Sequence, residues 1–183
     1  CKKPFPSMPL KFWNDKNNKK FEKAYFQRFK NIWHHGDYAE VKKSGGYIIY
    51  GRSDATLNPG GVRLGTAEIY SEVEKFKQVK ESMAVGQSWD NDIRIILFVI
   101  LNKGYDLNTD LVKKIKKQIR INASPRHVPE KIISVTDIPR TKNGKIVELA
   151  VKNTIEGNKI KNKEALANPE ILKEYVNIKE LND

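Results

Sequence analysis

The longest apolar run in the chain, IILFVIL at residues 95–101, is the feature that most constrains the fold. The run has the length of a strand, whereas a helix that spans a bilayer needs about 20 apolar residues. A strand this rich in Ile, Leu and Val is typical of a sheet interior, where both faces are covered. We therefore expect residues 93–101 to form a central strand, with residues 82–87 as its neighbour.

The segments around this strand predict a mixture of helices and further strands. Residues 131–136 predict a third strand, and residues 32–41 and 46–52 predict a hairpin. Apolar residues at helical spacing predict helices at 21–29, from 66 onward, from 109 onward and at 147–155. This order predicts an α+β fold with a small, mixed-order sheet and packed helices.

Some finer details of these elements also follow from the sequence. Thr66 and Thr109 are the expected N-caps of two helices, because a threonine hydroxyl accepts a hydrogen bond from the first helical turn. The apolar residues that the second of these helices should bury are Leu111, Val112, Ile115 and Ile119. The aromatic residues expected in the core are Trp33, Tyr47 and Phe98.

The chain is strongly basic, with 34 Lys and Arg against 22 Asp and Glu and a net charge of +12. One interpretation is a non-catalytic module that binds nucleic acid or another polyanion. The lysines are spread along the chain, however, and aromatic residues are not interleaved with them for stacking on bases. We therefore favour a lysine-rich solvated surface and expect no nucleic-acid partner; the salt dependence of binding to generic DNA separates the two interpretations.

The single cysteine, Cys1, excludes an internal disulfide. Neither a signal-peptide pattern nor a segment of membrane-spanning length occurs in the sequence. We therefore expect a cytoplasmic location and no membrane segment.

Residues 51–68, GRSDATLNPGGVRLGTAE, combine glycines with two arginines. Glycine lets a backbone turn tightly and approach a ligand, and the planar donors of Arg52 and Arg63 suit phosphates. Upstream, Asp37 could accept hydrogen bonds from two ribose hydroxyls. The simpler alternatives are surface ion pairs for the arginines and a local backbone contact for the aspartate.

Lys145 ends a second polar stretch, PRTKNGK at residues 139–145. An ammonium there could offset negative charge on a carboxylate or phosphate. The stretch is not a phosphate-binding P-loop, because Pro139 and Ile146 stand where that motif needs glycine and Ser or Thr. Taken alone, Lys145 is most simply a solvated turn residue.

The histidines do not suggest a metal site. His34 and His35 are adjacent, so in a strand they would face opposite sides. His127 has no cysteine or histidine at ligand spacing. We expect no metal bound by side chains of this chain.

Taken together, these motifs resemble the C-terminal part of the acyl-adenylate-forming superfamily, which includes acyl-CoA synthetases. The matching stretches are WHHGD (33–37), GRSD (51–54), GGVRLGTAE (60–68) and PRTKNGK (139–145). Within the superfamily, the chain most resembles the acetoacetyl-CoA synthetases. The stretches behind that choice are FWND (12–15), AYF (24–26), HGDY (35–38), SDATLNPGGVR (53–63), SPRHVP (124–129) and ANPEIL (167–172). The acetyl-CoA synthetases are a close alternative, because GTAEI (65–69) suits them equally.

The resemblance implies a two-step reaction. ATP and acetoacetate would give an acyl-adenylate and pyrophosphate, and coenzyme A would then attack to give acetoacetyl-CoA and AMP. For the first step, the resemblance implies that Lys145 is the adenylation lysine and that Asp37, with Arg52 beside it, binds the ribose. For the second step, it implies that Arg63 approaches the AMP phosphate, that Gly61 lines the pantetheine tunnel and that Arg120 meets the nucleotide end of coenzyme A. Asp54 would be the hinge between the two poses. His35 stands where much of the superfamily has threonine, whereas the acetoacetate branch has histidine.

The resemblance also implies a division of the chain. Residues 1–53 would be the hairpin-rich end of a large N-terminal adenylation domain, and residues 54–183 the mobile C-terminal lid. ATP with Mg²⁺ would be held mainly by the N-terminal domain, which the sequence given does not contain. We therefore expect this chain alone to be inactive. An acetyl- or propionyl-CoA synthetase remains an alternative, because no acyl pocket lies in this chain.

Overall fold

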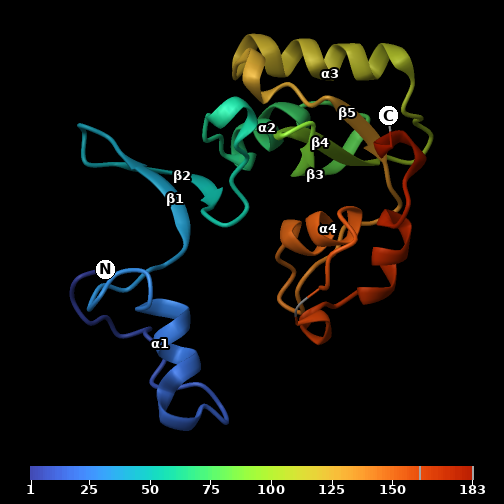
Figure 1. Ribbon diagram of the computed structural model, residues 1–183. Coiled ribbons are helices and arrows are strands. Elements are labelled where there is room, and N and C mark those ends of the chain that lie inside the picture. The colour runs from blue at the N-terminus through green and yellow to red at the C-terminus, as the bar shows by residue number, and fades with distance from the viewer. Residues whose placement is uncertain (161, 183) are drawn as a thin grey trace. The chain divides into compact units, whose positions relative to one another are not determined.

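The computed structural model describes residues 1–160 and 162–182, and it divides the chain into two compact units (Figure 1). The first unit is Cys1–Asp37, and the second is Tyr38–Asp183. The predicted domain boundary at Asp54 lies inside the second unit. The rotation of residues 54–183 about this point stays a prediction. Residues 161 and 183, which fall in the predicted lid, lie outside the described residues.

The first unit is organised around aromatic side chains. Helix α1 (Lys19–Tyr25) follows the short 3-10 helix η1 (Lys16–Asn18). Tyr25 stacks on Trp33 with ring centroids 3.7 Å apart. Trp33 is buried, which confirms its predicted place in a core. The helix predicted at 21–29 is present but ends four residues early, at Tyr25.

The predicted hairpin is confirmed, but its first arm is shorter than expected. It consists of β1 (Asp37–Val41) and β2 (Tyr47–Arg52). Residues 32–36 are not part of the arm, since the amides of Trp33 and His34 donate to backbone carbonyls of the first unit. The prediction for Tyr47 was wrong: its side chain is 71% exposed, on a sheet of only two strands among the described residues.

The second unit contains a three-stranded sheet with strand order β3-β4-β5. Strand β4 (Asp92–Leu101) lies in the centre, as predicted, antiparallel to β3 (Val79–Trp89) and parallel to β5 (Lys131–Ser134). The buried residues of β4 alternate between the two faces, as the period of a strand requires. Ile95, Leu97 and Val99 join one hydrophobic cluster, and Ile96, Phe98 and Ile100 join the other.

Helices cover both faces of this sheet (Figure 1). Helices α2 (Thr66–Val73) and α3 (Thr109–Asn122) bury their apolar faces in the cluster that contains Leu97. Helix α4 (Glu148–Ile155) and the C-terminal tail bury theirs in the cluster that contains Phe98. The predicted α+β fold with a mixed-order sheet is confirmed.

The two predicted N-caps were each wrong by one residue. Asn108 caps α3, because its side chain accepts a hydrogen bond of 2.9 Å from the amide of Leu111. Gly65 precedes α2, and no side chain fits there, since an added β-carbon would lie 2.5 Å from the backbone oxygen of Tyr50. Of the residues expected to be buried by α3, only Val112 is partly exposed.

The remaining elements are short 3-10 helices. Their bounds are η2 Pro59–Gly61, η3 Pro125–His127, η4 Lys163–Ala165, η5 Pro169–Tyr175 and η6 Lys179–Leu181. Helix η5 begins directly after Asn168, and its Tyr175 is fully buried in the α4-side cluster. Within the described ranges, no helix combines the length and apolarity that crossing a membrane requires.

Candidate functional site

Lys145 lies at the end of a tight turn, as predicted, and is exposed. The amide of Thr141 donates to the carbonyl of Lys145 at 2.8 Å, and the hydroxyl oxygen of Thr141 accepts from the amide of Lys145 at 3.1 Å. The amide of Gly144 closes the turn by donating to the carbonyl of Thr141 at 2.8 Å. The backbone therefore holds the position of Lys145 while its ammonium remains in solvent.

The arginine at the start of the same turn braces it against two other elements. The guanidinium of Arg140 donates to the carbonyl of Gly144 at 3.1 Å and forms an ion pair with Glu81 of β3. Its backbone amide donates to the side chain of Asn168 at 2.9 Å. The turn is thus tied to the sheet and to the C-terminal tail.

The glycine-rich loop before α2, residues 58–63 (the glycine loop), is held by hydrogen bonds to Asp92. The amide of Gly60 donates to both carboxylate oxygens of Asp92, at 3.0 and 2.9 Å. Gly61 has a φ of +74°, a conformation that glycine adopts at little cost, and an added β-carbon would meet no atom within 4 Å. The guanidinium of Arg63 lies 5.6 Å from the ring centre of Tyr38, a cation–π distance.

The lysine turn and the glycine loop are anchored on opposite faces of the sheet. Ile146 and Val147, next to Lys145, pack against the α4-side cluster. Leu57 and Leu64, which flank the glycine loop, belong to the cluster under α2 and α3. Arg120 is exposed on the last turn of α3. Lys145 and Gly61, which are predicted to serve different half-reactions, therefore lie in segments that are anchored on different faces of one sheet.

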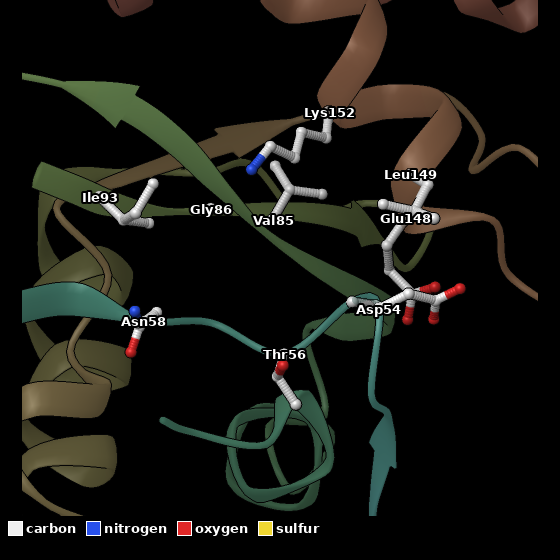
Figure 2. A pocket seen from close by; sticks show the side chains of 10 residues that line it. Asp54, Thr56, Asn58, Val85, Gly86, Ile93, Glu148, Leu149 and Lys152 are labelled. Carbon is white, nitrogen blue, oxygen red and sulfur yellow. The ribbon is translucent and has the colours of Figure 1, made fainter. Parts of the chain in front are cut away.

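The segment around the predicted hinge carries a group of charges. Arg52 and Asp54 form an ion pair with 3.5 Å between Nε and Oδ1. Asp54 also lines a pocket of about 220 Å³ together with Glu148 and Lys152 of α4, and Figure 2 shows Asp54 and Glu148 at the same end of it. The predicted hinge residue therefore lies beside the helix that follows the lysine turn.

Glu148 is the feature of this region that the sequence did not reveal. The hydroxyl of the partly buried Tyr70 donates to Glu148 at 3.2 Å and accepts from the amide of Ala84 at 3.1 Å. Burial raises the pKa of Glu148 above 4.5, and the charge of Asp54 adds to the rise, while hydrogen bonds and Arg52 oppose it. No signal in the sequence joins α4 to α2 across this distance along the chain.

This raised pKa makes stability depend on pH in a defined direction. The folded chain binds the Glu148 proton more tightly than the unfolded chain does. The free energy of unfolding therefore falls as pH rises from 4.5, the pKa of this carboxyl in the unfolded chain, through its higher pKa in the folded chain. Glu148→Gln removes this loss. We expect the variant to be more stable than the parent at pH 7, with the difference shrinking towards pH 4, as measured by urea midpoints. A difference independent of pH would contradict this.

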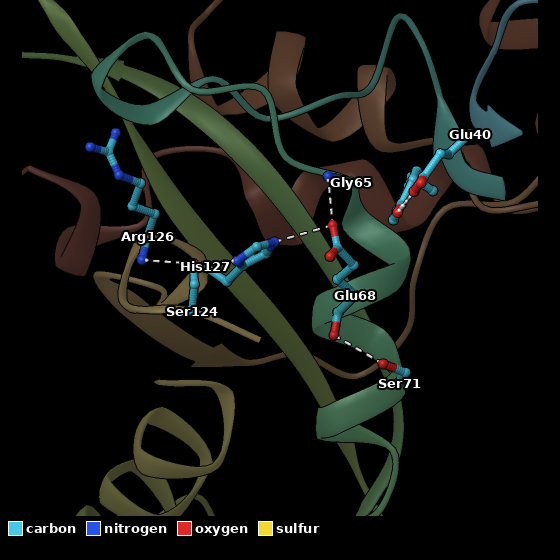
Figure 3. A network of polar contacts seen from close by, with 8 residues as sticks. Glu40, Gly65, Glu68, Ser71, Ser124, Arg126 and His127 are labelled. Carbon is cyan, nitrogen blue, oxygen red and sulfur yellow. Dashed lines mark hydrogen bonds and ion pairs between the residues drawn. The ribbon is translucent and has the colours of Figure 1, made fainter. Parts of the chain in front are cut away.

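A second polar network ties α2 to the short helix η3 (Figure 3). The imidazole of the buried His127 pairs through Nε2 with Glu68 at 3.2 Å and through Nδ1 with the Ser124 hydroxyl at 2.8 Å. Glu68 also accepts from the amide of Gly65 at 3.4 Å. The position of Glu68 three residues after the N-cap is typical of a helix-capping acid and could have indicated part of this network.

Asp37 ends the first unit. Its carboxylate lies 2.5 Å from Nδ1 of His35. The histidine that distinguishes this sequence from much of the superfamily is therefore a hydrogen-bond partner of the aspartate predicted to bind ribose.

Comparisons with known proteins agree with the predicted resemblance. Residues 68–145 match the family model for the AMP-binding enzyme C-terminal domain. The acetoacetyl-coenzyme A synthetase of Rhizobium meliloti is 58% identical over 181 residues, which cover 99% of this chain and 28% of the relative. The acetoacetyl-CoA synthetase of Mus musculus is 47% identical and covers 100% of this chain, which spans 28% of that relative.

Solved structures give the same result. The acetoacetyl-CoA synthetase from Streptomyces lividans superimposes with a TM-score of 0.87 at 37% identity, over 98% of this chain and 27% of that protein. The anthranilate CoA ligase AuaEII, solved in complex with anthranoyl-AMP, gives a TM-score of 0.65 at 28% identity over 75% of this chain and 26% of that protein. The chain thus spans little more than a quarter of the proteins it matches. The predicted resemblance to the C-terminal part of acyl-adenylate-forming enzymes, and within them to acetoacetyl-CoA synthetases, is confirmed.

Proposed function

We propose that this chain is the C-terminal part of an ATP-dependent acid–CoA ligase that converts acetoacetate to acetoacetyl-CoA. The observation that carries the proposal is the near-complete alignment of the chain with relatives named acetoacetyl-CoA synthetase, at 58% and 47% identity. The placement of Lys145 and the glycine loop on two faces of the sheet supports it, because each half-reaction then has its own group.

In the first half-reaction, a carboxylate oxygen of acetoacetate attacks the α-phosphorus of ATP and pyrophosphate leaves. Two anions must approach each other for this step. Lys145 supplies a cation that offsets their charge. The hydrogen bonds of its turn already hold the backbone in place, so no reorganisation of the backbone is needed. Asp37 accepts hydrogen bonds from the ribose hydroxyls, with Arg52 as a further nucleotide contact.

In the second half-reaction, the thiol of coenzyme A attacks the adenylate carbonyl, loses its proton, and AMP leaves. The domain turns about Asp54 between the two half-reactions, and this rotation brings the glycine-loop face to the active site. Gly61 leaves room for the pantetheine arm, Arg63 approaches the phosphate of AMP, and Arg120 meets the nucleotide end of coenzyme A. A rotation is required because Lys145 and Gly61 are anchored on opposite faces of the sheet.

The division of labour with the rest of the enzyme is part of the proposal. Residues 1–53 form the end of the N-terminal adenylation domain and residues 54–183 the mobile lid. ATP with Mg²⁺ is held mainly by the N-terminal domain, and this chain adds single cations from its turn and loop. The cytoplasmic location expected from the sequence stays a prediction.

ATP–pyrophosphate exchange tests the proposal. The full-length protein should exchange label with acetoacetate and much less with acetate or propionate, whereas this chain alone should not exchange at all. A full-length protein that prefers acetate or propionate would assign it to the alternative branch. Full activity of this chain alone would overturn the proposed division between the domains.

A further inference from the structure

Arg126 is an exposed arginine that none of the assigned roles uses. It lies on η3, and its guanidinium is directed at the glycine loop: a β-carbon on Gly60 would lie 3.6 Å from Nη1 of Arg126. Among the residues that the structure describes, no carboxylate forms an ion pair with this guanidinium. Its charge is therefore available to a ligand that enters along the loop.

The backbone that carries Arg126 is held by the network around His127. The amide of Arg126 donates to the Ser124 hydroxyl oxygen at 3.2 Å, and that hydroxyl pairs with His127, which pairs with Glu68 of α2. Figure 3 shows the Arg126 side chain extending away from His127. The network thus fixes the base of Arg126 and leaves its guanidinium outside, which lowers the entropic cost of ordering it on a ligand.

Arg126, rather than the loop itself, favours an anion as the partner. Asp92 occupies the amide of Gly60, so this amide cannot donate to an incoming phosphate, and the Asp92 carboxylate repels one. An anion at this end of the loop therefore needs a cation, and Arg126 supplies one beside Gly60. A guanidinium matches phosphate oxygens with paired donors.

We propose that Arg126 binds the diphosphate of coenzyme A in the thioester-forming pose. The inference rests on the proposed function, in which Gly61 lies along the pantetheine arm. The diphosphate is the group at the far end of that arm, and the Arg126 guanidinium lies beside Gly60, the residue next to Gly61. Arg120, six residues earlier on α3, then meets the nucleotide end, so the two arginines divide the anionic part of coenzyme A between them.

The test uses the full-length enzyme with Arg126→Ala, Arg126→Lys and the matched control Lys117→Ala, an exposed cation on α3. Each is assayed with coenzyme A, 3′-dephospho-coenzyme A and pantetheine as acceptors. Loss of one charge-assisted contact should raise KM for coenzyme A about tenfold in Arg126→Ala. The same rise is expected with 3′-dephospho-coenzyme A, which keeps the diphosphate. No rise is expected with pantetheine, Arg126→Lys should recover part of the loss, and Lys117→Ala should match the parent.

Adenylation separates the possible failures. Pyrophosphate exchange with acetoacetate should be unchanged in every variant, because Arg126 acts only on coenzyme A. If the parent lacks this exchange, the proposed function fails and takes the inference with it. If the parent exchanges normally but Arg126→Ala keeps the parent KM for coenzyme A, or loses activity equally with pantetheine, the role of Arg126 is refuted while the proposed function stands.

Discussion

Lys145→Ala in the full-length enzyme is expected to lower adenylate formation by about 10²- to 10³-fold, the usual cost of removing one group that stabilises developing charge. Thioester formation from supplied acetoacetyl-adenylate should remain close to that of the parent. The reason is geometric: Lys145 is anchored with the α4 face of the sheet, whereas the loop proposed to receive coenzyme A is anchored on the other face. Pyrophosphate exchange and single-turnover thioester formation measure the two steps separately.

The same turn offers a matched control for this substitution. Lys142 is also exposed, and the contact it makes through its backbone, from its amide to the carbonyl of Ala165, does not depend on its side chain. Lys142→Ala should leave both half-reactions unchanged. Because Lys145 is held by backbone bonds and a threonine hydroxyl, its truncation should not unfold the turn. Equal activity of the Lys145 and Lys142 variants would make Lys145 a surface lysine and remove the basis of the assigned adenylation role.

Local patterns in the sequence were sufficient for most of the fold. The central strand follows from an apolar run that only a two-sided environment accommodates, and α3 follows from Leu111, Ile115 and Ile119 at helical spacing. One error arose where a local pattern competes with a distant partner. Residues 32–36 look extended, but Trp33 is held in the first unit by contacts with Cys1 and Tyr25.

The candidate site was predictable only as far as it consists of motifs. Lys145, Gly61 and Arg63 stand in stretches whose order resembles a known superfamily. The Tyr70–Glu148 contact joins residues 78 positions apart, and the His127–Glu68 contact joins residues 59 apart. Such pairs arise from the packing that brings Tyr70 of α2 to Glu148 of α4 and Glu68 of α2 to His127 of η3. Neither periodicity nor a motif specifies that packing, so the groups beside Asp54 and behind Arg126 required the structure.

Gly61→Leu is expected to impair thioester formation and to spare adenylation, the opposite of the result expected for Lys145→Ala. In the proposed thioester-forming pose, Gly61 borders the path of the pantetheine arm, so a leucine side chain should obstruct the approach of the thiol. Because misplacement of a reacting group by about 1 Å can cost about 100-fold, we expect a loss of at least that order in thioester formation. Pyrophosphate exchange with acetoacetate should stay near the parent rate, since the first half-reaction uses the other face of the sheet.

Gly104→Leu is the control that gives this result its meaning. Both glycines have positive φ, +74° at Gly61 and +86° at Gly104, and an added β-carbon at either meets no atom within 4 Å. Each substitution therefore carries a similar backbone penalty of about 1–2 kcal/mol, and at neither position does the new β-carbon clash with the chain. Equal melting temperatures, with thioester formation lost only in Gly61→Leu, would locate the obstruction in the path of coenzyme A. Equal loss in both variants would attribute the effect to backbone strain, and the tunnel assignment of Gly61 would have to be withdrawn.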